Sequence, residues 1–288
     1  MFSETVRCSE EIGSLSKNAV IGNLELVNST IRFEGEGHVL YCEGGVKLVN
    51  STIRFCSSEN GLLYLSSSRH PYRLDVTIWN NSTVAFGKNC YFNGNLHAIA
   101  SERQSIIVGE DCLMSFGIWL RTADPHLLYS CETHERINQS ASIVIGDHVW
   151  LGQDAMILKG STIGSGSILA AKALLSGRSV PSNQCWGGVP ARMVSKGVFY
   201  RSNSVHAYSD KQTEESQVFP SDKYVYAGST PVLQDIELSQ FGNHAPADRI
   251  KVLTRLYGNS DKNRFAISEY IKAKPPMLCR ALRRIWRG

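Results

Sequence analysis

The chain has 288 residues, of which 42% are hydrophobic and 19% are charged, a balance typical of soluble globular proteins with one large or two modest domains. Its net charge of +4 is too small to indicate a nucleic-acid partner. No apolar run approaches the roughly eighteen residues of a transmembrane helix, so we expect no such helix.

The N-terminal segment MFSETVRCSE has no apolar stretch, and we therefore expect no signal peptide. The eight cysteines are scattered, and none forms a CxxC pair that would favour a zinc site. These observations predict a reduced, cytoplasmic protein without a metal site.

Residues 20–100 contain an internal repeat. The octapeptide LVNSTIRF occurs at 26–33 and again at 48–55, and a shorter echo, NSTVAF, follows at 81–86. Apolar residues spaced by six accompany the copies and continue beyond them: Ile21, Val27 and Phe33, then Val49 and Phe55, Phe86 and Phe92, and Val108, Met114 and Leu120. We interpret the copies as equivalent sides of successive irregular coils of about eighteen residues, each lengthened by about four residues in a corner loop. The alternative is an ordinary β-rich region with turn-forming Asn and Ser.

A polar segment at 121–142 interrupts the spacing of six, and long excursions from a regular repeat are often functional. It contains His126, with Asp124 two residues earlier and His134 further on. Taken alone, a loop histidine is more often solvated than catalytic, and an Asp before a Pro is equally well explained as a turn residue.

The most regular repeat follows at 143–180. Six aliphatic residues recur every six positions, and a small or β-branched residue follows each of them four positions later. The aliphatic residues are Ile145, Leu151, Ile157, Ile163, Leu169 and Leu175. A period of six fits neither a helix nor a long strand, but it fits a short strand followed by a tight corner. Three such sides close one coil, which predicts a parallel β-helix whose coils pack against their neighbours.

The spacing of six ends near residue 200, and we expect an irregular extension at 201–244 and a helical extension at 245–288. Pro246 and Gly258 bracket a predicted helix over ADRIKVLTRLY, since Pro favours helix starts and Gly favours helix ends.

A second helical pattern runs over 260–273. Residues 272–288 then carry six basic side chains and no acidic ones. This tail either contacts an anionic polymer or the inner membrane surface, or it packs as a helix on the open end of the solenoid.

The run IVIGDHVWLGQDAMILKGSTIGSGSILAAKALL and the later WGGVPARMV resemble the hexapeptide-repeat acyltransferases. The likeness covers about 86–197. It implies a mainly β domain at 1–200 with a left-handed parallel β-helix and a protruding catalytic loop. The segments GKNCYFNGN at 87–95 and IIVGEDCLMSFGIWL at 106–120 make the chain most similar to O-acetyltransferases of capsule polysaccharides, polysialic acid among them.

The resemblance implies a catalytic centre. The histidine of the protruding loop is the general base in such enzymes and corresponds to His126, and the tryptophan of the following H-V-W-[IL]-G element corresponds to Trp150. A corner position turns this indole outward, where it either lines the site or packs in a trimer. Asn95 matches a residue that holds the acceptor hydroxyl, and Asp124 is a candidate to orient the substrate. We expect His148 to be an outward-facing structural residue.

The resemblance also implies acetyl-CoA as the acyl donor, without a metal. Gly152 and Ala170 are small residues on the face along which relatives lay pantetheine, and Arg192, in G-x-P-A-[RK], matches a residue that meets CoA phosphates. Lys159 and Lys172 are candidates to add positive charge, although exposed lysines are usually only solubilising. Lys172 stands where relatives commonly carry Gly, so its local contacts to CoA are expected to differ.

The resemblance therefore predicts direct acetyl transfer to a hydroxyl of a bacterial surface polysaccharide, either a capsule or a lipopolysaccharide, by a homotrimer. The chain has no G-x-S-x-G elbow and no GxxxxGK[ST] loop, which disfavours a serine acyl-enzyme and ATP-dependent activation. Two alternatives remain open: an acetyltransferase for an antibiotic, serine or a free sugar, and a non-catalytic solenoid for scaffolding or carbohydrate binding.

Overall fold

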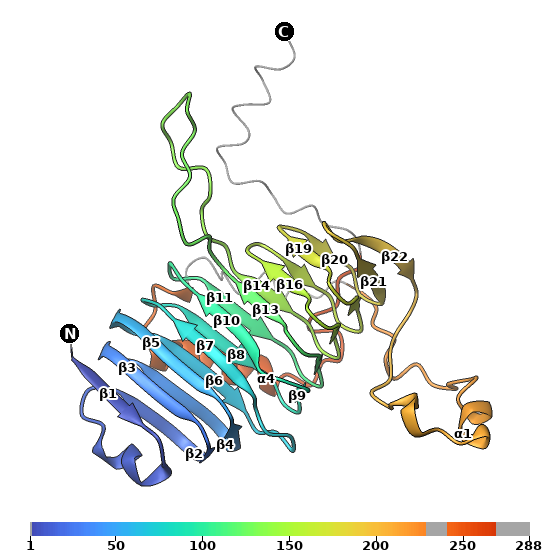
Figure 1. Ribbon diagram of the computed structural model, residues 1–288, viewed down its shortest axis with the longest axis horizontal. Coiled ribbons are helices and arrows are strands. Elements are labelled where there is room, and N and C mark those ends of the chain that lie inside the picture. The colour runs from blue at the N-terminus through green and yellow to red at the C-terminus, as the bar shows by residue number, and fades with distance from the viewer. Residues whose placement is uncertain (1, 229–240, 269–288) are drawn as a thin grey trace.

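A computed structural model describes residues 2–228 and 241–268. They form a parallel β-helix with one protruding loop and a C-terminal extension packed along its side (Figure 1). The mainly β fold class and the parallel solenoid are confirmed. Through the regular coils, the chain passes from sheet A to sheet B, then to sheet C, and back to sheet A.

Each sheet is a column of stacked strands. Sheet A contains β1 (Ser3–Val6), β3 (Thr30–Glu36), β5 (Thr52–Glu59), β7 (Leu74–Ile78), β10 (Leu96–Ala100), β13 (Trp119–Arg121), β16 (Met156–Leu158) and β19 (Leu174–Ser176). Sheet B contains β2 (Ala19–Val27), β4 (Val39–Val49), β6 (Leu62–Ser66), β8 (Thr83–Phe86), β11 (Ser105–Val108), β14 (Ile143–Ile145), β17 (Thr162–Ile163) and β20 (Ser179–Val180). Sheet C contains β9 (Tyr91–Phe92), β12 (Leu113–Met114), β15 (Trp150–Leu151), β18 (Ile168–Leu169), β21 (Gln184–Gly187) and β22 (Arg192–Lys196). Strands β1 and β22 pair antiparallel with their neighbours, whereas the stacked coils pair in parallel.

The duplicated octapeptide stacks on itself, as predicted. Thr30 pairs with Thr52 and Phe33 with Phe55, so identical residues of the two copies lie in register on β3 and β5. The two phenylalanine rings are parallel, with centroids 4.8 Å apart. The echo NSTVAF behaves differently, because its strand β8 belongs to sheet B rather than to the column of the two copies.

The predicted corner loop in the early coils is wrong. The 22 residues from one copy to the next are used by two long strands in alternation, for example β3 followed by β4, with only short turns between them. A register shift between Ile21 and Asn23 interrupts the pairing of β2 with β4, and Gly22 there has a φ of 97°. Such an irregularity bends a strand. One long bent strand can therefore cover the distance for which the regular coils use a short strand and a corner.

The core confirms the prediction that the aliphatic residues spaced by six in 143–180 point into the solenoid. All six aliphatic residues of that repeat are at most 1% exposed and join one continuous apolar core with the early coils. Burying each such side chain contributes roughly 1.5–3 kcal/mol. Close stacking of the coils explains the glycines after them: a Cβ at Gly146 would lie 2.7 Å from the Ser165 nitrogen in the next coil.

The C-terminal extension covers the outside of sheet B. Helix α4 (Pro246–Gly258) lies where a helix was predicted and packs Leu253, Leu256 and Tyr257 against apolar residues that face outward from sheet B. Among the described residues before α4, the extension contains η2 (Val205–Ala207) and the exposed helix α1 (Asp210–Glu215). A further 3-10 helix, η1 (Ser9–Ser14), lies near the N-terminus. The second predicted helix is absent over 259–268, and the rest of it, with the basic tail, lies outside the described residues.

A buried arginine attaches this helix to the solenoid. The Arg249 side chain is fully buried and donates hydrogen bonds to the carbonyl oxygens of Asn60, Asn81 and Ser82 and to the Thr83 hydroxyl. Burial lowers its pKa to about 10, so the guanidinium is still charged at neutral pH. Carbonyl groups at the coil corners thus depend on a side chain more than 160 residues away in the sequence.

We expect Arg249→Leu to destabilise the fold by about 2–4 kcal/mol, because it leaves several buried carbonyl groups without a donor. Thermal denaturation followed by circular dichroism measures the effect. Arg255→Leu, on the exposed side of the same helix, is the matched control. Equal melting temperatures for the two variants would contradict this role of Arg249.

Candidate active site

A long loop, 122–142, leaves the solenoid between β13 and β14 and rises above its surface (Figure 1). Asn138 anchors the base of this loop. Its buried side-chain amide donates to Asp124 Oδ2 at 3.0 Å and to the His126 carbonyl at 2.8 Å, and its Oδ1 accepts from the Leu128 N–H at 2.9 Å. The loop is therefore fixed where it carries His126, although its outer residues are exposed.

A second anchor comes from Glu102, in the coil that precedes the loop. Arg136 forms two hydrogen bonds of 2.8 Å with the carboxylate of Glu102, which also accepts from the Ser140 hydroxyl. The Arg136 guanidinium lowers the pKa of Glu102 to about 2. This pair therefore keeps its charge, and its hold on the loop, throughout the physiological pH range.

His126 is exposed, and within the described part of the chain its imidazole forms no hydrogen bond. The neighbouring Asp124 accepts a hydrogen bond of 2.6 Å from the Lys159 ammonium, and this bond lowers the pKa of Asp124. Lys159, predicted to bind the cofactor, thus lies under the loop, with 22% of its side chain exposed. The Lys159 ammonium also donates to the Asn138 carbonyl at 3.2 Å, so it holds the loop both before and after the candidate base.

Trp150 faces out of sheet C and is 36% exposed. Its indole N–H donates to the Ser115 hydroxyl at 3.2 Å, and its ring lies 5.8 Å from that of Tyr200. His148 points outward, as predicted, but aromatic rings cover it: it stacks between Tyr200 at 4.3 Å and Tyr224 at 4.0 Å. Burial lowers the pKa of His148, which favours its neutral form.

The remaining predicted residues line the edge where the chain turns from sheet C to sheet A, here called the C–A edge. Gly152 and Ala170 occupy equivalent positions in successive coils, and a Cβ at Gly152 would lie 2.5 Å from the Ala171 nitrogen. Lys172 follows, with 81% of its side chain exposed and its ammonium 3.4 Å from Asp154. Arg192 is exposed beside this edge, where β22 pairs with β21.

Asn95 belongs to the same edge, between β9 and β10. Its side-chain amide donates to the Asn50 carbonyl at 2.7 Å, and the residue is half-buried. The predicted substrate contact of Asn95 therefore competes with a structural bond to an earlier coil.

The structure separates the predicted residues into two groups. Asp124, His126 and Lys159 lie at the edge between sheets A and B, here called the A–B edge, because the loop and Lys159 each follow a sheet A strand. The other six lie on sheet C or along the C–A edge. Sheet A stands between the groups, so a single chain does not bring His126 to Trp150.

Sequence reasoning missed the contribution of the extension to this region. Tyr200 and Tyr224, which enclose His148, lie in a segment without periodicity, and nothing in their spacing points to a histidine on the solenoid. Among the described residues, no group of His, Cys, Asp and Glu has an arrangement suited to a metal ion. The described helices also include none with the length and apolar character needed to cross a membrane.

Comparison with known proteins supports the fold assignment. Residues 142–177 match the family described as bacterial transferase hexapeptide (six repeats). Over these residues the chain resembles the hexapeptide-repeat family. In solved structures, it resembles the polySia-specific acetyltransferase NeuO, with a TM-score of 0.57 and 22% identity over 69% of this chain and 85% of that one. The polysialic acid O-acetyltransferase OatWY gives a TM-score of 0.50 and 22% identity over 68% and 98% of the two chains.

Curated relatives agree with this assignment. The polysialic acid O-acetyltransferase of Neisseria meningitidis is 43% identical over 67 residues, which are 23% of this chain and 31% of the relative. The putative lipopolysaccharide biosynthesis O-acetyl transferase WbbJ of Escherichia coli is 29% identical over 43% of this chain and 65% of its own length. The chain thus matches between about a third and two thirds of these relatives, and the resemblance to such O-acetyltransferases predicted from the sequence is confirmed.

We expect Asn138→Ala to loosen the loop, because this side chain makes three hydrogen bonds that hold its base. Hydrogen–deuterium exchange should then accelerate at the Leu128 amide, whose partner is lost. The control is Glu132→Ala at the exposed part of the same loop. Unchanged protection at Leu128 would show that other contacts suffice to hold the loop.

Proposed function

We propose that the protein is an acetyl-CoA-dependent O-acetyltransferase that modifies a hydroxyl of a bacterial surface polysaccharide. The observation that carries this proposal is the anchored loop, which holds the backbone of His126 at its base while the imidazole stays open to an incoming substrate. The names of the curated relatives support the reaction class, since they include two polysialic acid O-acetyltransferases and a putative lipopolysaccharide biosynthesis O-acetyl transferase.

In the proposed reaction, His126 removes the proton from the acceptor hydroxyl as the oxygen attacks the thioester carbonyl. Collapse of the tetrahedral intermediate breaks the carbon–sulfur bond, and the imidazolium returns its proton to the departing thiolate. General base catalysis of this kind contributes roughly 10²–10⁴-fold to the rate. The order of bond changes needs no covalent enzyme intermediate.

The oxyanion of the intermediate needs a donor that is already in place, and one such donor is worth roughly 3 kcal/mol. We assign this role to the indole N–H of Trp150. It now donates to the Ser115 hydroxyl at 3.2 Å, a group that can rotate away without any movement of the backbone. The stack of Tyr200 and His148 behind Trp150 holds the ring in place.

The C–A edge is the proposed seat of the donor. Gly152 and Ala170 leave this edge without protruding side chains over two coils, which suits an extended pantetheine arm. Arg192 lies beside it with its side chain exposed and can meet the phosphates of CoA. Lys172 is free enough to contribute, whereas we now assign Lys159 to positioning the loop through Asp124.

Two copies of the chain are needed to complete such a site. Since His126 and Trp150 lie at different edges, we propose that the A–B edge of one copy meets the C–A edge of the next. A contact between two different surfaces closes into a ring when repeated by rotation, and a trimer is the ring expected here. Helix α4 already occupies sheet B, which leaves sheets A and C for this contact.

We place the reaction in the cytoplasm, where acetyl-CoA is available. The seven cysteines among the described residues are all free thiols, in keeping with a reduced compartment. Contact of the basic tail at 272–288 with an anionic polymer or membrane remains part of the proposal, on the evidence of its charge alone.

We expect His126→Ala to lower kcat for acetyl transfer by about 10²–10⁴-fold while the affinity for CoA is unchanged. Release of CoA thiol in the presence of purified capsule and lipopolysaccharide polymers measures the rate, and calorimetry measures CoA binding. His134→Ala, a second exposed histidine in the same loop, is the control. Full activity of His126→Ala would exclude it as the base, and failure of the unmodified protein to bind CoA would favour a scaffold.

Mixing two inactive variants tests the shared site. After His126→Ala and Trp150→Ala chains are refolded together in equal amounts, random assembly should leave about a quarter of the sites with both side chains intact. We therefore expect about a quarter of the unmodified activity to return. If His126 and Trp150 acted within one chain, mixing would restore none.

A further inference from the structure

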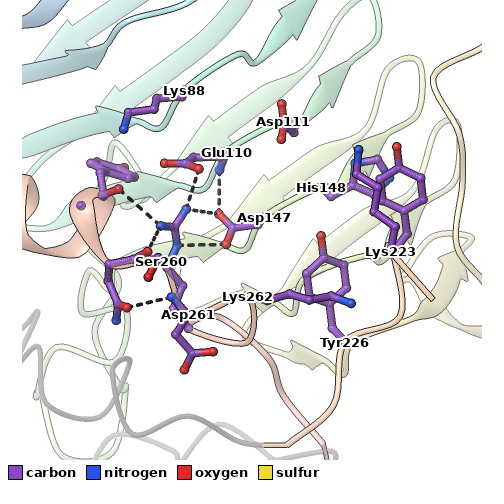
Figure 2. A pocket seen from close by; sticks show the side chains of 15 residues that line it. Lys88, Glu110, Asp111, Asp147, His148, Lys223, Tyr226, Ser260, Asp261 and Lys262 are labelled. Carbon is purple, nitrogen blue, oxygen red and sulfur yellow. Dashed lines mark hydrogen bonds and ion pairs between the residues drawn. The ribbon is translucent and has the colours of Figure 1, made fainter. Parts of the chain in front are cut away.

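A cavity of about 320 Å³ lies between the solenoid and the C-terminal extension (Figure 2). Its floor comes from the edge where the chain turns from sheet B to sheet C, including Glu110 and Asp147. Its other walls come from two parts of the extension, around Tyr224 and around Arg264. The volume is sufficient for one ring-sized ligand. None of the residues predicted for catalysis or donor binding lines it.

Arg264 fixes the geometry of the floor. Its guanidinium donates two hydrogen bonds of 3.0 Å to the Asp147 carboxylate, forms an ion pair with Glu110 at 3.0 Å, and donates to the carbonyl groups of Tyr257 and Asn259 (Figure 2). All five donors of the side chain are thereby used. The charge of Arg264 is balanced by two carboxylates, so it offers nothing further to a ligand.

One acceptor on the floor is left unused. Glu110 Oε1 is buried and has no hydrogen-bond partner among the described residues, although the other oxygen of the same carboxylate faces Arg264. Burial raises the pKa of Glu110. A buried acceptor without a donor is unfavourable, and a ligand hydroxyl that donates to it would remove that cost.

Three lysines are among the side chains that line the cavity. Lys88, Lys223 and Lys262 come from three separate segments, and within the described ranges none of their ammonium groups forms an ion pair. Lys223 lies over the Tyr224 ring, and Lys262 lies over the Tyr226 ring. Two carboxylates also border the cavity. Asp111 lies 3.9 Å from Arg69, whereas Asp261 accepts a hydrogen bond from a backbone N–H.

We infer that this cavity binds one carboxylated sugar unit. The carboxylate would meet a lysine ammonium group, and a ring hydroxyl would donate to Glu110 Oε1. A neutral sugar would satisfy the acceptor but leave the lysines unpaired, and a simple anion would leave the acceptor unused. A ligand that carries both a carboxylate and a ring hydroxyl matches the cavity.

The cavity is connected to the candidate active site through stacked rings. Tyr224 forms part of its wall, and from there His148 and Tyr200 lead to Trp150 with centroid separations of 4.0, 4.3 and 5.8 Å. The inference rests on the proposed function at this point: one unit of an acidic polymer lies in the cavity while another is acetylated beyond Trp150. The cavity would then select acidic polysaccharides as acceptors.

Calorimetry without acetyl-CoA tests the inference, with tetramers of sialic acid and of galacturonic acid and their carboxyl-reduced forms as probes. We expect at least one acidic tetramer to bind, and its reduced form to bind at least about tenfold more weakly. Lys88→Ala and Lys223→Ala should each weaken binding about tenfold, and Glu110→Gln should do the same. Lys211→Ala, which removes an equally exposed charge on α1, is the control. Melting temperatures establish that each variant is folded.

Binding of the reduced tetramers as tight as that of the acidic ones, binding by neither acidic tetramer, or unchanged affinity in the Lys88 and Lys223 variants would each overturn the inference. Acetyl transfer by the same proteins separates it from the proposed function. If acetyl transfer continues while the acidic and the carboxyl-reduced tetramers bind equally well, only the cavity assignment is refuted. Carboxylate-dependent binding without transfer to any polymer refutes only the transferase assignment.

Discussion

Stacking of coils in parallel register is the constraint on which the other features depend. The backbone N–H groups of the stacked strands donate to carbonyl groups of an adjacent coil, so a residue there is positioned by the residue one coil away more than by its neighbours in sequence. This is why identical octapeptides lie side by side, and why Gly146 and Gly152 follow the inward aliphatic residues where corners touch. Stacking also aligns the corners of successive coils into continuous edges of the solenoid. Small residues from several coils can therefore form one surface along such an edge.

The regular repeat and helix α4 were predictable from the sequence, whereas the path of the early coils and the contacts of the extension were not. The inward set from Ile145 to Leu175 and the excursion carrying His126 both follow from a spacing of six and its interruption. Arg249 and Arg264 gave no comparable signal, since each is one basic residue in a helical or polar stretch whose partners on the solenoid lie more than 100 residues away. The bond between Asp124 and Lys159 also emerged only when the sheets were assigned, because it joins the loop to the next coil along the chain.

The sequence proposed which residues form the candidate site, and these assignments stay predictions, whereas the arrangement of the residues could not be predicted from it. The resemblance identified the residue types, and the positions of Gly152, Ala170 and Arg192 along one edge suit the role that it implied. The distribution of His126 and Trp150 over two edges depends on which sheet each preceding strand joins, and residue spacing alone does not reveal this. The aromatic stack of Tyr200, His148 and Tyr224 adds a second layer behind Trp150, so the extension helps to shape this region as well as covering sheet B.

The two antiparallel strands have a consequence for how copies of the molecule associate. A parallel solenoid with open ends is a template on which a second solenoid can continue the ladder, and unlimited growth into fibres is the hazard. Here β1 closes sheet A at one end and β22 closes sheet C at the other, each running against the direction that a further coil would require. These two strands therefore disfavour continuation of the parallel ladder at one end of sheet A and at the opposite end of sheet C, which favours sideways contacts between copies.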